Sequence, residues 1–152
     1  MALTPQQNDA WRSLVMMTHV LEDALDTQAQ ADGGLPHAYY KVLVFLYEAP
    51  DRSLTMAELA RAQRFSPSRL THAVASMVRS GWVRRTVSPT DKRVRIIQLT
   101  EAGIRLVRRV SPRQVTRVRE RVFANLSDEQ VLQLSAIGAQ ILAGLDSEPR
   151  QG

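Results

Sequence analysis

Cysteine is absent from the 152 residues, which excludes disulfides, thiolate metal sites and thiol-based redox sensing together. Long apolar runs are absent too. The longest, Val42 to Tyr47, has six residues, far fewer than the roughly 20 that span a bilayer. The first ten residues lack the basic stretch and apolar stretch of a secretory signal. We therefore expect a cytoplasmic protein with no membrane partner.

The residue patterns that catalysis requires are also missing. The histidines, His19, His37 and His72, form neither a His-x-x-x-His nor a Glu-x-x-His pair, the spacings that place two metal ligands on one helix face. The chain has no glycine-rich phosphate loop and no Gly-x-Ser-x-Gly elbow. We therefore expect no metal, no cofactor and no enzymatic activity.

Acidic residues are scarce in one part of the chain only. Residues 61–121 hold 16 of the 20 lysines and arginines but only three acids, Asp91, Glu101 and Glu120. The flanking segments, 1–60 and 122–152, are both net negative. A modest excess of cations would indicate only a solvated basic surface. Segregation on this scale favours a polyanionic partner instead, because clustered cations attract phosphates.

Apolar residues recur at helical spacing over about 8–31 and 36–48. Gly33 and Gly34 are expected to end the first of these helices. The residues expected to be buried on the second are Tyr40, Leu43, Val44 and Tyr47. A loop should follow over residues 49–52.

Two helix starts lie close together in residues 55–80. Thr55 and Glu58 match a capping box, and Ser66 followed by Pro67 matches an N-cap with proline in the first helical position. Gly81 is a natural stop for the second helix. Two short helices at this separation predict a helix-turn-helix. The inner face of its second helix would comprise Leu70, Ala73, Val74, Met77 and Val78.

After these helices, the spacing of the apolar residues changes from the helical period to the period of two that is typical of strands. Residues 82–87 and 94–99 favour strands, and a polar, basic stretch connects them. A long helix should begin at Thr100 and be kinked or split at Pro112. Its inward residues would be Ile104, Val107, Val115, Val118 and Val122. Ser127 and Gln130 match another capping box, which opens a last helix.

These elements predict a mainly α fold with a small β-hairpin wing (α+β), formed by one domain over residues 1–152. Within it we expect a winged helix-turn-helix lobe over 36–114, with the helix-turn-helix at 55–80 and the wing at 82–99. Residues 8–34 and 115–146 are expected to form a helical dimerisation region, because their apolar stripes are too extensive for one short lobe to cover.

The order of these elements resembles the multiple antibiotic resistance regulator (MarR) family from about Leu35 to Leu145. The similarity is carried by "SPSRLTHAVASMVRSGWVRR" followed by "SPTDKRVRIIQLTEAG". Its most specific part is the wing, where Asp91-Lys92-Arg93 matches the family's Asp-x-Arg signature. The resemblance implies a homodimer whose lobes bind neighbouring major grooves of duplex DNA at a pseudo-palindromic operator. It also implies release from DNA when a small anionic aromatic molecule binds between lobe and dimer helices.

Polar residues on the outer face of the second helix and on the wing are the candidate DNA contacts. Hydroxyls at a helix N-terminus suit phosphate oxygens, and arginine can donate to guanine O6 and N7. Arg93 suits a minor groove or pairs with Asp91, which in turn can brace the loop. His72 stands where the family commonly has arginine, so it either reads a base or contacts the backbone. The candidates are Ser66, Pro67, Ser68, Arg69, Thr71, His72, Arg84, Asp91, Lys92, Arg93 and Arg95.

Aromatic and basic residues in segments that border one crevice in the family are the candidate effector contacts. They are Trp11, His19, His37, Tyr39, Tyr40, Arg105 and Arg109. Aromatics at helical spacing can equally be core residues. Arginine also recurs every fourth residue from Arg105 to Arg121. This stripe can extend the DNA-binding field or line an anion pocket. Its later members can instead pair with Glu22, Asp23 or Asp26.

Three function classes follow from the sequence. The first is a sequence-specific, ligand-responsive regulator, with a ligand-independent DNA binder as its variant. The second is a winged-helix module whose wing binds protein, which a weak salt dependence of DNA binding would favour. The third is a small hydrolase or metal enzyme, and bound metal found by elemental analysis would support this class.

Overall fold

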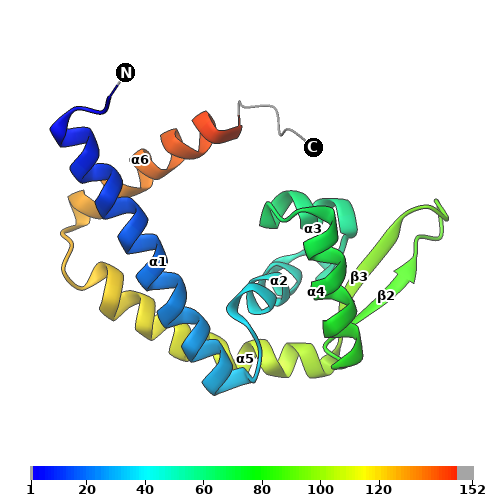
Figure 1. The fold of residues 1–152 in the computed structure, drawn as a ribbon. Helices are drawn as coiled ribbons and strands as arrows, with labels where there is room; N and C mark the ends of the chain where they lie inside the picture. The colour runs from blue at the N-terminus through cyan, green and yellow to red at the C-terminus, as the bar shows by residue number, and fades with distance from the viewer. Residues whose placement is uncertain (1, 147–152) are drawn as a thin grey trace. The chain divides into compact units, whose positions relative to one another are not determined.

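The computed structural model describes residues 2–146 (Figure 1). The elements, in chain order, are α1 (Pro5–Gly33), α2 (His37–Glu48), the 3-10 turn η1 (Pro50–Arg52), β1 (Ser53–Thr55), α3 (Met56–Gln63), α4 (Pro67–Arg79), β2 (Val83–Val87), β3 (Arg95–Leu99), α5 (Glu101–Val118), the π-helical turn η2 (Arg119–Phe123) and α6 (Asp128–Asp146). The chain divides into two compact units after Gln114, and each is described by itself. No helix in residues 2–146 is long and apolar enough to cross a membrane.

The core of the first unit lies among α2, α3, α4, the sheet and the first turns of α5, with the end of α1 packed against it. On α2 the fully buried apolar side chains include Val42, Leu43 and Leu46. The predicted burial of Tyr40 and Leu43 is confirmed, whereas Val44 and Tyr47 are only partly buried and the buried Val42 and Leu46 were not predicted. The error arises because α2 is covered on more than one side, so its buried face is wider than a single stripe.

The sheet is antiparallel with strand order β1-β3-β2. Strands β2 and β3 form the predicted wing hairpin, with Val83 opposite Leu99 and Val87 opposite Arg95. Strand β1 pairs with the other edge of β3. Strand β1 was not predicted, because three residues carry no periodicity and their partners lie about forty residues away.

The helix-turn-helix forms where the caps predict it. Thr55 and Glu58 make the reciprocal capping box of α3, and Arg64 ends that helix in the left-handed conformation, with φ at 52°. The Ser66 side chain caps α4. Gly81 follows α4 with φ at 72°, a conformation that glycine adopts at no steric cost. The predicted inner face of α4 is confirmed except for Val78, which is 40% exposed.

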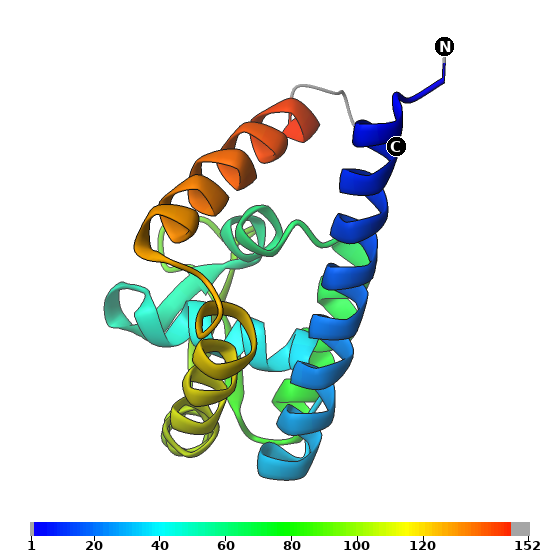
Figure 2. The ribbon, with the colours of Figure 1, turned by 90° about the vertical axis from the view of Figure 1, so that its left-hand side faces the viewer.

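Helix α1 is one continuous helix in two perpendicular views (Figures 1 and 2). It begins three residues before the predicted start, because Thr4 and Gln7 form a capping box that the sequence analysis did not notice. It ends at Gly34, whose φ of 69° is left-handed. Its first four turns contribute no buried residue, whereas Leu25, Gln28 and Ala29 are buried near its end.

Helix α5 starts tightly against the wing. Thr100 Oγ1 donates to Gly81 O at 2.6 Å and accepts from Gly103 N at 3.1 Å. A Cβ on Gly103 would overlap the carbonyl oxygen of Trp82, so only glycine fits. Pro112 lies inside α5 without splitting it, because the α-helix continues to Val118. Of the two predicted effects of Pro112, a kink or a split, the split is therefore wrong.

The second unit comprises the end of α5, η2 and α6. Ser127 and Gln130 make the predicted capping box, through bonds of 2.9 and 3.2 Å. Val115 was expected to face inward but is 54% exposed. Helix α6 has no buried residue, although its stripe is apolar.

Candidate nucleic-acid interface

The N-cap and first two turns of α4 present three hydroxyl groups at the surface. Ser66 Oγ accepts from Arg69 N at 3.4 Å and lies 3.3 Å from Ser68 Oγ. Thr71 Oγ1 donates to Pro67 O at 2.8 Å. All of these residues are exposed. A helix N-terminus with open hydroxyls and amides suits the negatively charged oxygens of a phosphate.

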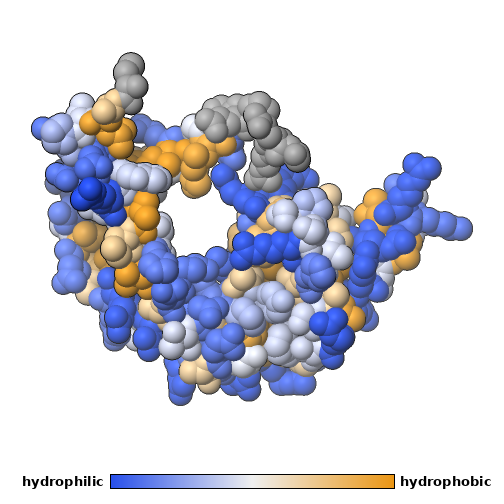
Figure 3. Space-filling view, viewed as in Figure 1, coloured by the Kyte–Doolittle hydropathy of each residue, from blue (hydrophilic) through white to orange (hydrophobic). Residues whose placement is uncertain are grey.

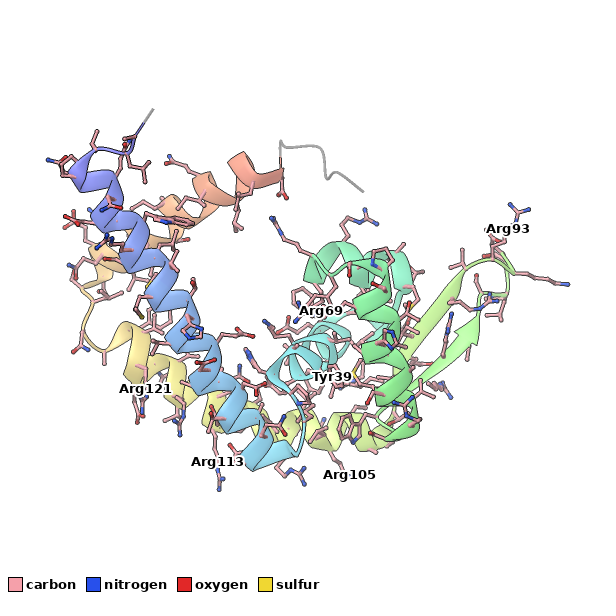
Figure 4. The ribbon with its side chains drawn as sticks, in the orientation of Figure 1. Tyr39, Arg69, Arg93, Arg105, Arg113 and Arg121 are labelled. Carbon is pink, nitrogen blue, oxygen red and sulfur yellow. The ribbon has the colours of Figure 1, made fainter. Side chains whose placement is uncertain are left out.

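Arg69 lies directly above an aromatic ring. Its guanidinium carbon is 4.6 Å from the centroid of Phe65, within the range of a cation–π contact. Stacking uses the face of the guanidinium, so its in-plane N–H donors stay available to a base or phosphate. Figure 4 labels Arg69 beside α3 and α4.

Phe65 supports this surface from below and was not among the candidate residues from the sequence. It is 8% exposed and belongs to the core cluster together with Leu70. A signal was present, because an apolar residue just before an N-cap and another at the fourth helical position match a hydrophobic staple. The staple holds the ring under Arg69, so the core itself positions the side chain.

The remaining outer face of α4 is polar. Thr71 and His72 are exposed, while Leu70, Ala73 and Val74 are buried beneath them. The helix therefore separates a face that packs on the lobe from a face open to a partner.

The tip of the wing is braced by its own polar groups. Asp91 Oδ1 accepts from the backbone N of Arg93 at 2.9 Å, and Arg95 Nη1 donates to Lys92 O at 2.6 Å. Ser88 N also donates to Val94 O at 3.0 Å. Asp91 thus braces the loop through the backbone and leaves the guanidinium of Arg93 open. Figure 4 shows Arg93 projecting from the wing tip, and Figure 3 colours the tip hydrophilic.

Two wing arginines already donate hydrogen bonds to groups within the lobe. Arg84 donates from Nε and Nη2 to Gln98 Oε1, at 2.9 and 2.6 Å, across the β2–β3 pair. Gln98 in turn donates to Asp51 O at 3.4 Å. Arg95 uses one nitrogen in the tip brace. Among the candidate wing cations of the described chain, Lys92 and Arg93 make no such side-chain bond within the lobe.

The predicted effector residues do not converge in this structure. His37 is 4% exposed: its ring lies 3.1 Å from Glu22 Oε1 and 2.8 Å from Gln114 Nε2. Tyr40 stacks on His37 and is equally buried, and this burial raises the pKa of its phenol. Both residues therefore belong to the packing between α1, α2 and α5.

The other aromatic candidates lie elsewhere. Trp11 is exposed on α1, three turns or about 16 Å along the helix from Glu22. His19 is exposed and lies 3.5 Å from Asp23. Tyr39 is half-buried, and Figure 4 shows Arg105 on the far side of α5 from it. Arg109 is exposed.

The arginine stripe pairs with α1, but through an acid other than those named. Arg113 Nη1 lies 2.6 Å from Asp32 Oδ1. The three expected acids have other partners, because Glu22 contacts His37 and Lys41, Asp23 contacts His19, and Asp26 accepts from the His37 amide. The predicted acids are wrong because the turn of α1 that faces α5 is set by helix packing, not by spacing along the chain.

An open hollow of about 490 Å³ lies where α2, η1, β1 and α3 meet. Its apolar lining includes Phe45, Pro50 and Leu54, and its polar lining includes Glu48 and Arg61. None of the predicted effector residues lines it.

The fold and this surface define a winged helix-turn-helix DNA-binding protein. A profile of the MarR family matches residues 33–94. The crystal structure of Sco3205, a MarR family transcriptional regulator from Streptomyces coelicolor in complex with DNA, is 42% identical, covers 100% of this chain and 94% of its own, and superposes with a TM-score of 0.93. The chain belongs to the MarR family.

Two further relatives extend the comparison. The HTH-type transcriptional repressor YetL of Bacillus subtilis is 30% identical over 114 residues, which are 75% of this chain and 65% of YetL. CouR from Rhodococcus jostii RHA1, solved with bound p-coumaroyl-CoA, is 26% identical with a TM-score of 0.74, over 84% of this chain and 87% of its own. The chain is thus a DNA-binding transcriptional regulator rather than an enzyme.

Proposed function

We propose that the protein is a homodimer that binds a pseudo-palindromic operator, with α4 in the major groove and the wing tip at the adjacent minor groove. One observation carries this proposal: the lobe has both a polar outer face on α4 and a braced wing tip. On α4, the ring of Phe65 supports Arg69. At the wing tip, Asp91 binds the backbone and leaves the Arg93 guanidinium open. Such a pair fits direct base readout beside minor-groove insertion.

Apolar exposure within each unit supports the dimer. In the first unit, α1 leaves Trp11, Met16 and Val20 exposed, and Figure 3 shows apolar side chains along this helix. In the second unit, α6 buries nothing, and Leu132 and Leu145 are among its exposed residues. Contiguous apolar surface of this kind marks an interaction site.

Selection of bound duplexes from random DNA tests the proposal. A recovered inverted repeat with half-sites about 10 bp apart would support it, as would a mass near twice 17.1 kDa in light scattering. A monomer at micromolar concentration would overturn the dimer and the palindrome together. Binding that barely responds to salt would favour a protein-binding wing instead.

We further propose that a small anionic aromatic molecule releases the operator, and that the protein acts as a cytoplasmic repressor. The complex of CouR with an aromatic acyl-CoA supports the ligand class, and the name of YetL supports repression. In this chain the open candidates are Trp11, His19, Tyr39, Arg105 and Arg109, since His37 and Tyr40 are buried. Titration with salicylate-like anions should lower operator affinity, and by linkage the operator should lower ligand affinity equally.

A further inference from the structure

Two arginines converge on one tyrosine at the end of α2, away from the recognition helix. The guanidinium carbon of Arg52, in η1, lies 4.4 Å from the ring centroid of Tyr47. Arg108, in α5, donates from Nε to the Tyr47 hydroxyl at 3.4 Å. The tyrosine thus has one cation from a neighbouring turn over its ring face and a second cation, from the distant helix α5, at its hydroxyl.

Neither cation is neutralised locally. In residues 2–146, no carboxylate lies within ion-pair distance of Arg52 or Arg108. Glu101 acts on Arg108 only through space, and Glu48 and Asp51 are neighbours in the chain of Tyr47 and Arg52. The bond from Arg108 and the contact with Arg52 lower the pKa of the Tyr47 phenol from its ordinary value, as a locally positive potential does.

The backbone holds Arg52 in an unfavourable conformation. Asp51 and Arg52 have φ values of 50° and 52°, in the left-handed region that L-residues other than Asn and Asp rarely adopt. Arg52 Nη1 is also buried without a hydrogen-bond partner. Strained backbone and an unsatisfied donor of a charged group are both uncommon in packed structure and concentrate at ligand sites.

We propose that Arg52, Arg108 and Tyr47 form a binding site for an oxyanion, a carboxylate or phosphate group. Two guanidinium forks supply charge-assisted donors for its oxygens. The phenol, which accepts from Arg108, has its own O–H to donate. The bound group belongs either to a small soluble anion or to a phosphate of the DNA backbone, since both have the same chemistry.

The soluble-anion arm of the test uses the full-length protein without DNA. Arginine Nε–H signals are followed by NMR while inorganic phosphate, or benzoate in a parallel series, replaces chloride at constant ionic strength. Saturable shifts of Arg52 and Arg108 are expected. Arg108→Gln should weaken the affinity about tenfold or more, and Tyr47→Phe should weaken it less. The matched control is Arg12→Gln, an exposed arginine on α1, which should leave the affinity unchanged.

The DNA arm measures how binding to a duplex depends on salt. If the occupant is a backbone phosphate, Arg52→Gln and Arg108→Gln each reduce the slope of log affinity against log salt by about 0.9, and Arg12→Gln does not. Saturable phosphate or benzoate shifts with an unchanged slope would identify a soluble anion. Variants that keep the wild-type thermal midpoint show that the fold is intact. Absence of both saturable shifts and a slope change would overturn the site, whether or not an operator is found.

Discussion

Arg69 is the residue whose replacement tests the DNA-binding surface most directly. Its backbone N is bound to the Ser66 cap and its guanidinium is stacked on Phe65, so the side chain is oriented before DNA arrives. Arg69→Ala removes the charge and the in-plane donors but leaves the cap and the buried face of α4 in place. Because Arg69 is exposed, losing the stack should cost the fold only about 0.5–1 kcal/mol.

The size of the binding defect depends on what Arg69 contacts. A bidentate contact with guanine discriminates against other bases by about 1–3 kcal/mol, which is about 5- to 150-fold in affinity. A phosphate contact would instead weaken all duplexes alike and reduce the salt slope by about 0.9. We expect the first pattern, with Thr71→Ala losing less, since the Thr71 hydroxyl is already bonded to Pro67 O.

The assay is competition binding of the selected operator against its single-base variants at two salt concentrations. Phe65→Leu should keep an apolar side chain in the core but remove the ring, so it should lower discrimination partially. If Phe65 acts through Arg69, the double variant should lose no more discrimination than Arg69→Ala alone. Equal weakening of all sequences by Arg69→Ala would refute base readout by this residue.

Three other outcomes follow from single contacts. Gly103→Ala forces a Cβ against the carbonyl of Trp82 and should lower the free energy of unfolding by about 1–3 kcal/mol, measured in urea. Hydrogen bonds from the Thr55 amide and hydroxyl lower the pKa of the Glu58 carboxyl in the folded protein. The ionised carboxylate therefore stabilises the fold at pH values above the pKa that Glu58 has in the unfolded chain. This stabilisation is lost as the pH falls through the pKa of Glu58 in the folded protein. The stability difference between wild type and Glu58→Gln should therefore be present at pH 7 and shrink below about pH 4, and an unchanged difference would contradict the assignment. Asp91→Ala removes the wing brace without removing a cation, so operator affinity should fall severalfold while the salt slope stays constant.

Residue types and their spacing were enough to predict the features that depend on neighbours within four residues. The capping boxes at Thr55 and Ser127, the Ser66 cap and the stop at Gly81 all form where the residue types require. Each needs only a side chain that reaches a nearby amide or a glycine at positive φ, so composition and spacing suffice. The wing hairpin and the outward polar face of α4 follow from periodicity in the same way.

Which distant residues meet depends on how the elements pack in the folded chain. Strand β1, the pairing of Arg113 with Asp32, and the bond from Arg108 to Tyr47 join segments whose separation in the chain carries no signal. The same holds for the burial of His37, which looked like an open site residue until α1 and α5 were placed around it. Side-chain partners across elements depend on the rotation and offset of each helix, and a single turn of difference exchanges one acid of α1 for another.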